Sequence, residues 1–374
     1  MKIVFVSDFL NHHQTLLCDN IHSQVDTFYF IHEYNGKGSV IKKREEREYT
    51  MLYKDNPKRA KEEILSADAV IFGSCPNRFI DMRMKENKLS FVYSERLFKK
   101  SILQMLKMKN YKAAKHRFMN YKDKNLYVLA ASAYLPYDLS HYRFSAEKIL
   151  KWGYFPEINL IKDVPKKENS ILFTGRFLDW KHTETVIETA RLLKKDKFTF
   201  KVSLIGDGPE KEKLQNLVNK YNLNDCVEFL GIKSHQEVMQ SMAEHEIFMF
   251  TSDYQEGWGA VLNEAMANGC AVVASSAAGA TPFLIKHNEN GKIYKYGKHK
   301  NAYQAVTELL LNKEEADRFG KNAMETIENE YNGKIAARKL IQSVMEFNNT
   351  GLITPYEDGV LSRAEIIKNN WFKQ

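Results

Sequence analysis

EIFMFTSDYQEGWGAVLNEAMANG, residues 246–269, is the stretch that decides the expected fold. It begins with an apolar run, which is typical of a strand covered on both faces of a parallel sheet. Gly257 and Gly259 follow in a polar loop, where glycine lets the backbone approach a ligand closely. A helical pattern then runs to Gly269, a residue type that often ends a helix. A helix start after a glycine loop presents unpaired N–H groups and suits a diphosphate.

Outward from this stretch, apolar runs of strand length alternate with helix-prone segments in both halves of the chain. In the first half we expect strands at 2–7, 27–32, 69–73, 90–93 and 127–131. In the second half we expect them at 171–174, 200–205, 226–230, 246–251 and 271–275. This alternation indicates a parallel sheet with helices on both faces, so we predict an α/β protein with two Rossmann-like domains.

Length and composition agree with two globular domains. The chain has 374 residues, of which 44% are hydrophobic and 27% charged, and domains commonly hold about 100 to 200 residues. The charged, proline-bearing stretch 162–170 is the expected linker. We predict one domain at 1–165, a second at 166–350, and a C-terminal helix within 351–374, over the amphipathic part 361–372, that crosses back to the first domain.

The sequence also lacks the signals of several other classes. The start of the chain has no secretory pattern, and no run of about 18 apolar residues occurs, so we expect neither export nor a membrane-spanning helix. Cys18, Cys75, Cys226 and Cys270 lie far apart and have no metal-binding spacing. We therefore expect a cytoplasmic protein with reduced thiols and no metal site.

Basic residues follow the first expected strand of the second half. Gly175 and Arg176 come directly after the strand, and Lys181 stands where the next helix begins. Arginine offers a forked set of donors and lysine a mobile point charge, a pair that suits two phosphate groups. The carboxyl ends of strands are where open α/β sheets bind ligands. Gly206 follows the next strand in a Gly-x-Gly turn, which either approaches a nucleotide or is a plain turn.

Glu256 and Glu264 are the two carboxylates of the opening stretch. The first lies in the loop and the second in the helix, so they are not a metal pair on one helix face. A carboxylate accepts hydrogen bonds from hydroxyls, which a sugar and a ribose both offer.

These motifs together resemble the retaining GT-B glycosyltransferases of family GT4, the glycosyl transferases group 1. The resemblance covers residues 168–335 and rests on Glu256-x7-Glu264, on Gly175-Arg176 with Lys181, and on LIGDGP, FLG and AMANG. It implies two Rossmann-like domains whose parallel sheets face a deep interdomain cleft, with the acceptor in the first and the donor in the second.

The resemblance also implies an activity. The reaction is retaining transfer of a sugar from a nucleotide-diphosphate sugar to a glycan or lipid-linked saccharide, in bacterial surface polysaccharide synthesis and without an obligatory cofactor or metal. We expect a UDP-sugar donor, with a GDP-sugar as the alternative.

Residue roles follow from the same resemblance. Arg176 and Lys181 hold the diphosphate, Glu256 contacts the hydroxyls of the donor sugar, and these three are the expected catalytic residues. Glu264 binds the ribose. The other expected donor-binding residues are Gly175, Gly206, Gly231, Ile232, Gly257, Trp258, Gly259, Ala260 and Val261.

The N-terminal half departs from the family pattern. SDFLNHHQ replaces the usual glycine-rich loop after the first strand, and Ser94-Glu95-Arg96 stands where many relatives have a histidine. The candidate acceptor or cleft residues are Asn11, His12, His13, Glu95 and Arg96. Helix capping and packing explain Asn11 and the two histidines equally well.

A basic segment, residues 96–124, is the electrostatic landmark of a chain with net charge +8. Asp123 is its only acidic residue, and leucine, methionine and aromatic residues are interleaved with the charges. Basic segments with apolar partners lie on anionic membrane surfaces, so we expect such a surface as a partner, or else a solvated face. No nucleic-acid motif accompanies the charge, and we expect no nucleic-acid partner.

Three alternative functions differ in what they require of the sequence. A sugar-nucleotide epimerase of similar fold needs paired acid and base groups beside the sugar carbon and turns over without an acceptor. A non-catalytic partner would bind a nucleotide sugar for another transferase. An NAD-dependent oxidoreductase is disfavoured, because Gly-x-Gly-x-x-Gly is absent after the first strand.

Overall fold

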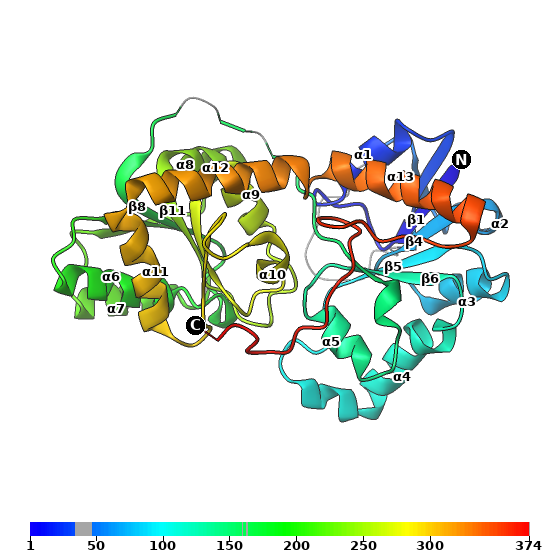
Figure 1. Cartoon of the computed structure of the whole chain (residues 1–374), viewed down its shortest axis with the longest axis horizontal. Helices are drawn as coiled ribbons and strands as arrows, with labels where there is room; N and C mark the ends of the chain where they lie inside the picture. Colours follow the sequence, from blue (N-terminus) through cyan, green and yellow to red (C-terminus); the bar gives the residue numbers. More distant parts are fainter. Residues whose placement is uncertain (34–46, 159, 162–163, 374) are drawn as a thin grey trace. The chain divides into compact units, whose positions relative to one another are not determined.

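The computed structural model describes residues 1–33, 47–158, 160–161 and 164–373. They divide into two compact units (Figure 1). The first unit holds Met1–Glu157 and Glu330–Ile367, and the second holds Ile158–Asn329 and Lys368–Gln374. Residues 330–350, which we expected in the second domain, therefore lie in the first unit.

The first unit is built on a seven-stranded parallel sheet. Its strand order is β3-β2-β1-β4-β5-β6-β7. The strands are β1 (Lys2–Ser7), β2 (Thr27–His32), β3 (Thr50–Leu52), β4 (Ala69–Phe72), β5 (Ser90–Ser94), β6 (Leu126–Ala130) and β7 (Ile149–Lys151). The apolar runs of the five longer strands are largely buried, as helix-covered parallel strands are. The five strands expected in this half are confirmed, whereas β3 and β7 were missed.

Helices cover this sheet on both faces. They are α1 (Thr15–His22), α2 (Pro57–Ser66), α3 (Asn77–Lys85), α4 (Met108–Arg117), α5 (Leu135–Ser140) and α13 (Gly333–Thr350), with the short 3-10 helices η1 (Ile102–Leu106), η2 (Met119–Tyr121) and η3 (Ala146–Lys148). Helix α13, late in the chain, packs along α1 at its beginning. Gly333 permits this close approach, because a Cβ there would lie 2.8 Å from the backbone nitrogen of Leu17.

The predicted C-terminal helix over 361–372 is wrong. Residues 351–373 form no helix, and part of them pairs with edge strand β7. Leu361 N donates to Lys151 O, and Lys151 N donates to Ser362 O, both at 2.8 Å. An edge strand offers unpaired backbone groups, and these bonds hold the tail extended.

The second unit is built on a six-stranded parallel sheet in the order β10-β9-β8-β11-β12-β13. The strands are β8 (Lys167–Thr174), β9 (Lys201–Ile205), β10 (Val227–Gly231), β11 (His245–Phe250), β12 (Ala271–Ser275) and β13 (Lys292–Tyr294). Strand β8 starts inside the expected linker 162–170, which is corrected accordingly. The winding reverses between β8 and β11, and such a switch point opens a ligand-binding crevice at the carboxyl ends of the strands.

The helices of the second unit follow the strands in turn. They are η4 (Asp179–Lys181), α6 (Glu184–Lys195), α7 (Lys211–Lys220), α8 (His235–Glu244), α9 (Val261–Ala267), α10 (Thr281–Leu284), α11 (His299–Leu311) and α12 (Lys313–Asn329). Helix α6 shows why they pack: Val186, Ile187, Ala190 and Leu193 form one apolar stripe buried in the core. This packing anchors the helix that follows Lys181.

Candidate active site

Two loops meet at the switch point of the second unit. One follows β8 and carries Arg176 and Lys181, and the other follows β11 and carries Glu256. The amide of Asp253 donates to Trp180 O at 2.9 Å. The Thr251 hydroxyl donates to Lys181 O at 2.5 Å. These bonds join the loops into one frame, so the structure brings together residues that the sequence separates widely.

Lys181 and Glu256 form an ion pair within this frame. The ammonium contacts Oε2 of Glu256, and each side chain is 16% exposed. The Ser252 hydroxyl donates to the same carboxylate oxygen at 3.1 Å. Because the pair is partly withdrawn from water, its attraction is screened less than that of a surface pair. Lys181 therefore has a carboxylate partner before any ligand binds.

Arg176 has the opposite environment. Its side chain is exposed, and no carboxylate of the described residues lies within ion-pair distance of its guanidinium. An unneutralised arginine at the carboxyl end of a strand is suited to an anionic ligand, since its donors form a fork that matches phosphate oxygens.

Glu264 lies on α9, directly beyond the β11 loop. Burial raises the pKa of its carboxyl to about 7. Within the part of the chain that the structure describes, no side chain or amide donates to this carboxyl. A half-buried carboxyl without donors is a costly arrangement, which hydroxyl groups of a ligand would relieve.

The β11 loop reaches α9 through Trp258 and Gly259. The indole of Trp258 is fully buried, and its Nε1 donates to Asn263 Oδ1 at 2.8 Å. Its side chain packs in the core and is closed to a ligand, which corrects our expectation for this residue. Gly259 has φ +96°, and a Cβ there would lie 2.3 Å from the ring of Phe250. Only glycine fits this turn.

The remaining predicted donor-binding positions line the same edge of the sheet. Gly206 N donates to Gly231 O at 2.8 Å, and a Cβ on Gly206 would lie 1.9 Å from Gly175 O. Three neighbouring loops are thus in backbone contact. Ile232 is 80% exposed beside them.

The start of α9 completes this edge. Gly257 is buried in the β11 loop. At the start of α9, Leu262 N donates to Gly259 O at 2.9 Å. The amides of Ala260 and Val261 lie just before it in the chain. Amides at a helix start have no intrahelical acceptor and are open to other partners.

A cluster of polar side chains around His182, next to Lys181, was not predicted from the sequence. His182 has φ +49°; its Nδ1 lies 2.7 Å from Glu184 Oε1 and its Nε2 lies 3.4 Å from Asp253 Oδ2. Hydrogen bonds to Asp253 and Glu184 raise the pKa of His182 to about 9. Tyr296 OH lies 3.2 Å from Nε2. The sequence signal was a histidine directly after Lys181, because Asp253 and Tyr296 come from other loops.

Two of the three candidate residues after β1, Asn11 and His13, are engaged within the fold. Asn11 Oδ1 accepts from His13 N at 3.0 Å, and its backbone oxygen accepts from Gln14 N and Thr15 N at the start of α1. The ring of His13 stacks on Tyr154 with centroids 5.3 Å apart. His12 is exposed. Of these three, His12 is the most accessible to a ligand.

The candidates after β5 are both engaged. Glu95 accepts from Tyr154 OH and pairs with Lys99. Arg96 is buried and pairs with buried Asp138 at 2.9 Å. Asp138 also accepts from the amide of Leu97 at 2.8 Å. The structure corrects the expectation for Arg96, because its guanidinium is consumed in an internal ion pair and is closed to an acceptor.

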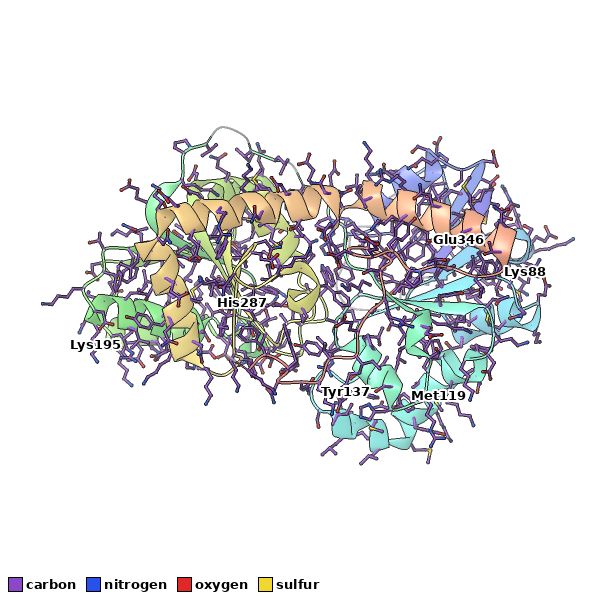
Figure 2. The ribbon with its side chains drawn as sticks, viewed as in Figure 1. Lys88, Met119, Tyr137, Lys195, His287 and Glu346 are labelled. Carbon is purple, nitrogen blue, oxygen red and sulfur yellow. The ribbon has the colours of Figure 1, made fainter. Side chains whose placement is uncertain are left out.

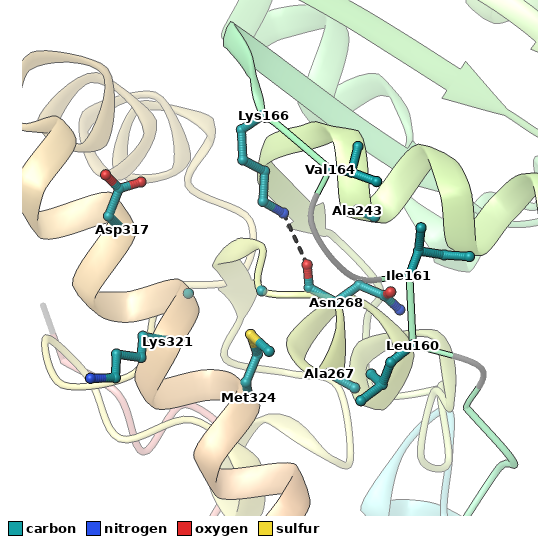
Figure 3. Close-up of a pocket in the computed structure, with 12 residues that line it drawn as sticks. Leu160, Ile161, Val164, Lys166, Ala243, Ala267, Asn268, Asp317, Lys321 and Met324 are labelled. Atoms are coloured by element: carbon teal, nitrogen blue, oxygen red, sulfur yellow. Dashed lines mark hydrogen bonds between the residues drawn. The ribbon is translucent and has the colours of Figure 1, made fainter.

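A pocket of about 460 Å³ lies elsewhere in the second unit (Figure 3). Lys166 and Gly269, which line it, precede β8 and β12, so the pocket is at the amino ends of the strands, opposite to Arg176. Lys166 Nζ donates to Asn268 O at 2.9 Å and to Met242 O at 3.1 Å. The charge of Lys166 is thus bound by carbonyl oxygens within the fold, and the pocket lies away from the loops that carry Arg176 and Lys181.

Two further features concern only the described residues. None of their histidine, cysteine and acidic side chains gather in threes as a metal site would require. None of their helices combines the length and the apolarity of a bilayer crossing.

Comparison with known proteins places these features in context. Residues 156–326 match the family model described as glycosyl transferases group 1. The amylovoran biosynthesis glycosyltransferase AmsK of Erwinia amylovora is 33% identical over 53% of this chain and 50% of its own length. The N-acetylgalactosamine-N,N'-diacetylbacillosaminyl-diphospho-undecaprenol 4-alpha-N-acetylgalactosaminyltransferase of Campylobacter jejuni is 29% identical over 40% of each chain. The alignments thus span about half the length of the curated relatives or less.

A solved structure, Anabaena HepE in complex with UDP, superposes with a TM-score of 0.70 over 92% of this chain and all of its own, at 15% identity. At that identity the likeness speaks for the fold alone. The predicted fold class is confirmed: the chain has the GT-B fold, with a parallel-sheet α/β domain in each unit.

Proposed function

We propose, on the premise that residues 156–326 belong to the glycosyl transferases group 1 family, that this protein transfers a sugar from a nucleotide-diphosphate sugar to a glycan or lipid-linked saccharide. One observation carries the proposal: exposed Arg176, which no carboxylate of the described residues neutralises, lies in the loop frame that holds the Lys181–Glu256 ion pair. The polysaccharide pathway named for the Erwinia relative supports a role in bacterial surface polysaccharide synthesis.

The cations explain how the site would accelerate the transfer. The bond from the anomeric carbon to the diphosphate breaks, and negative charge grows on the leaving phosphate oxygens. Arg176 and Lys181, held in fixed loops, stabilise that charge more in the transition state than in the ground state. A new bond forms from the same face between the anomeric carbon and the acceptor oxygen, whose proton passes to the leaving phosphate. This route retains the anomeric configuration.

The carboxylates would orient the donor. Glu256 accepts hydrogen bonds from hydroxyls of the sugar, and the donor diphosphate competes with Glu256 for the ammonium of Lys181. Glu264 accepts hydrogen bonds from the ribose, which supplies the donors that its half-buried carboxyl lacks. Exposed Ile232 and the backbone of Gly231 would face the base. UDP is the proposed nucleotide and GDP the alternative, and the UDP bound to Anabaena HepE supports the first.

Isothermal titration calorimetry of UDP and GDP tests this proposal. We expect one of them to bind wild-type protein, and Arg176→Ala to weaken that binding at least about tenfold, as loss of a charge-assisted hydrogen bond predicts. Lys195→Ala is the matched control, since Lys195 is exposed at the far end of α6 (Figure 2). Lack of binding by both nucleotides, or equal binding by both variants, would refute the proposed donor site.

The acceptor and the location of the protein complete the proposal. The Campylobacter relative is named for a diphospho-undecaprenol substrate, which supports a lipid-linked acceptor here. Such an acceptor lies at a membrane, so we place the protein in the cytoplasm with part of its first unit at the anionic inner face.

A further inference from the structure

The segment formed by η1 and α4 exposes a group of large apolar side chains. Leu103, Leu106 and Met108 are 67%, 74% and 64% exposed, and Tyr111 next to them is 39% exposed. Other exposed apolar side chains of the described residues, such as Leu311 and Leu352, are scattered singly, which is normal for a protein surface. Four within residues 103–111 form a local apolar surface that requires an explanation.

These residues are not a loosely packed core. The same segment has an inward side, on which Ile102 and Met105 pack against a small core of Phe98, Ala114 and Tyr142. Leu103 and Leu106 alternate with those inward residues and face the solvent. The segment is thus folded onto its unit with one apolar side satisfied and a second apolar side left open.

Exposed lysines are interleaved with these apolar residues along the segment. They are all exposed, and none has a described carboxylate within ion-pair distance: Lys100, Lys107, Lys109, Lys112 and Lys115. Other basic residues of the segment are engaged, since Arg117 binds the carbonyl oxygens of Gly73 and Cys75 and Arg96 binds Asp138. Asp81 of neighbouring α3 is occupied by His116 and Tyr121. The exposed lysines thus differ from Arg96 and Arg117, whose charges are bound within the fold.

We infer that the η1–α4 surface, which we define as Lys100 to Lys115, docks this protein on a bilayer that contains anionic phospholipids. Leucine and methionine at its centre enter the interfacial layer, and the surrounding lysines contact the headgroups while their aliphatic stems stay in apolar contact. A nucleic acid would instead favour exposed arginines and stacking aromatics. The inference deepens the proposed function, on which its biological purpose rests, because a lipid-linked acceptor is presented at such a surface.

Figure 1 shows α4 as a peripheral helix of its unit, beyond the strands of the first sheet. Met119, labelled in Figure 2, belongs to η2 directly after α4 and is partly buried against the same small core. The inward face of the segment thus continues beyond α4, and its outward face is left to the lipid.

Vesicle flotation with full-length protein tests the inference. We expect binding to vesicles of phosphatidylcholine mixed with phosphatidylglycerol, little binding to phosphatidylcholine alone, and release at high salt. A triple change, Leu103→Ser with Leu106→Ser and Met108→Ser, should abolish binding. Each lysine replaced by glutamine should weaken it about fivefold. The matched control, Leu311→Ser with Leu352→Ser, should bind like wild type.

The outcomes separate this inference from the proposed function. Nucleotide binding, measured on the same variants, reports the second unit and checks that the protein is folded. Vesicle binding that survives the triple change, or that is equal for neutral and anionic lipid, overturns the inference while the transferase proposal stands. If the wild-type protein does not bind vesicles but self-associates through this surface in analytical ultracentrifugation, the partner is a second copy and the membrane inference is wrong. Vesicle binding without nucleotide binding would refute the donor site alone.

Discussion

Arg176 and Arg96 both follow a parallel strand, one in each unit, and have opposite environments. Each lies two residues beyond a parallel strand, one ending at Thr174 and the other at Ser94. Arg96 is buried in an ion pair with Asp138, whereas Arg176 is exposed and has no described carboxylate partner. The fold uses one guanidinium to hold a loop and leaves the other available. A ligand site is recognised here by polar groups that the protein itself does not satisfy.

The largest expected effect comes from replacing the buried arginine, Arg96. Arg96→Ala leaves Asp138 as an uncompensated buried charge and should lower the free energy of unfolding by about 3 to 5 kcal/mol. Urea unfolding measures this loss. Arg96→Ala combined with Asp138→Ala should recover part of it, because the second change removes the unpaired charge. A single variant as stable as wild type would mean that the pair does not hold the loop.

Replacing the exposed arginine, Arg176, should lower activity and leave stability unchanged. Arg176→Ala should lower kcat/KM about 100- to 1000-fold, the usual effect of removing one donor that stabilises transition-state charge. Its melting temperature should stay unchanged, since the guanidinium makes no described ion pair. Steady-state kinetics and a thermal scan measure the two quantities, with Lys195→Ala as control. A stability loss comparable to that of Arg96→Ala would end the contrast between the two arginines.

Replacing Glu264 should show a trade-off between the stability of the protein and its binding of the nucleotide. Burial raises the pKa of Glu264 to about 7 from the ordinary value of 4.5, so the folded protein holds this proton more tightly than the unfolded chain. Its cost to stability is absent below pH 4.5, grows as the pH rises, and is fully present above pH 7. Glu264→Gln should therefore stabilise the ligand-free protein by about 2 to 3 kcal/mol at pH 8 and by almost nothing at pH 4.5.

The same Glu264 variant should bind the nucleotide more weakly, because an amide accepts hydrogen bonds from hydroxyls less well than a carboxylate. Denaturant unfolding at both pH values and calorimetry with the nucleotide measure the two effects. A variant that gains stability and keeps full affinity would show that Glu264 is a buried acid unrelated to the ligand.

His182 should give the smallest effect. Its pKa is raised from 6.5 to about 9 by Asp253 and Glu184. The stabilisation by the imidazolium is thus complete below pH 6.5 and is lost as the pH rises through 9. Since the side chain is 26% exposed, we expect about 1 to 2 kcal/mol. His182→Gln should remove this part of the pH dependence of the melting temperature between pH 6.5 and 9. A variant with the same pH dependence as wild type would show that Asp253 and Glu184 do not stabilise a charged His182.

Failures of the sequence prediction have physical causes that can be named. Strands β3, β7 and β13 have three residues each, too few to show a period. The tail 361–372 has a helical pattern, but edge strand β7, distant in sequence, offers it backbone partners instead. His182 was overlooked because Asp253 lies 71 residues further along the chain.

Local pattern alone determined the α/β class, the ten longer strands, the loops that carry Arg176, Lys181 and Glu256, and the helix that carries Glu264. These features depend on the polarity of neighbouring residues, which a single chain displays directly. Only the tertiary structure decided which charges remain available. Arg96 is closed because Asp138, 42 residues away, is buried beside it, and Trp258 is closed because the core surrounds its indole. Burial and pairing arise between distant segments, so they exist only once the chain has folded.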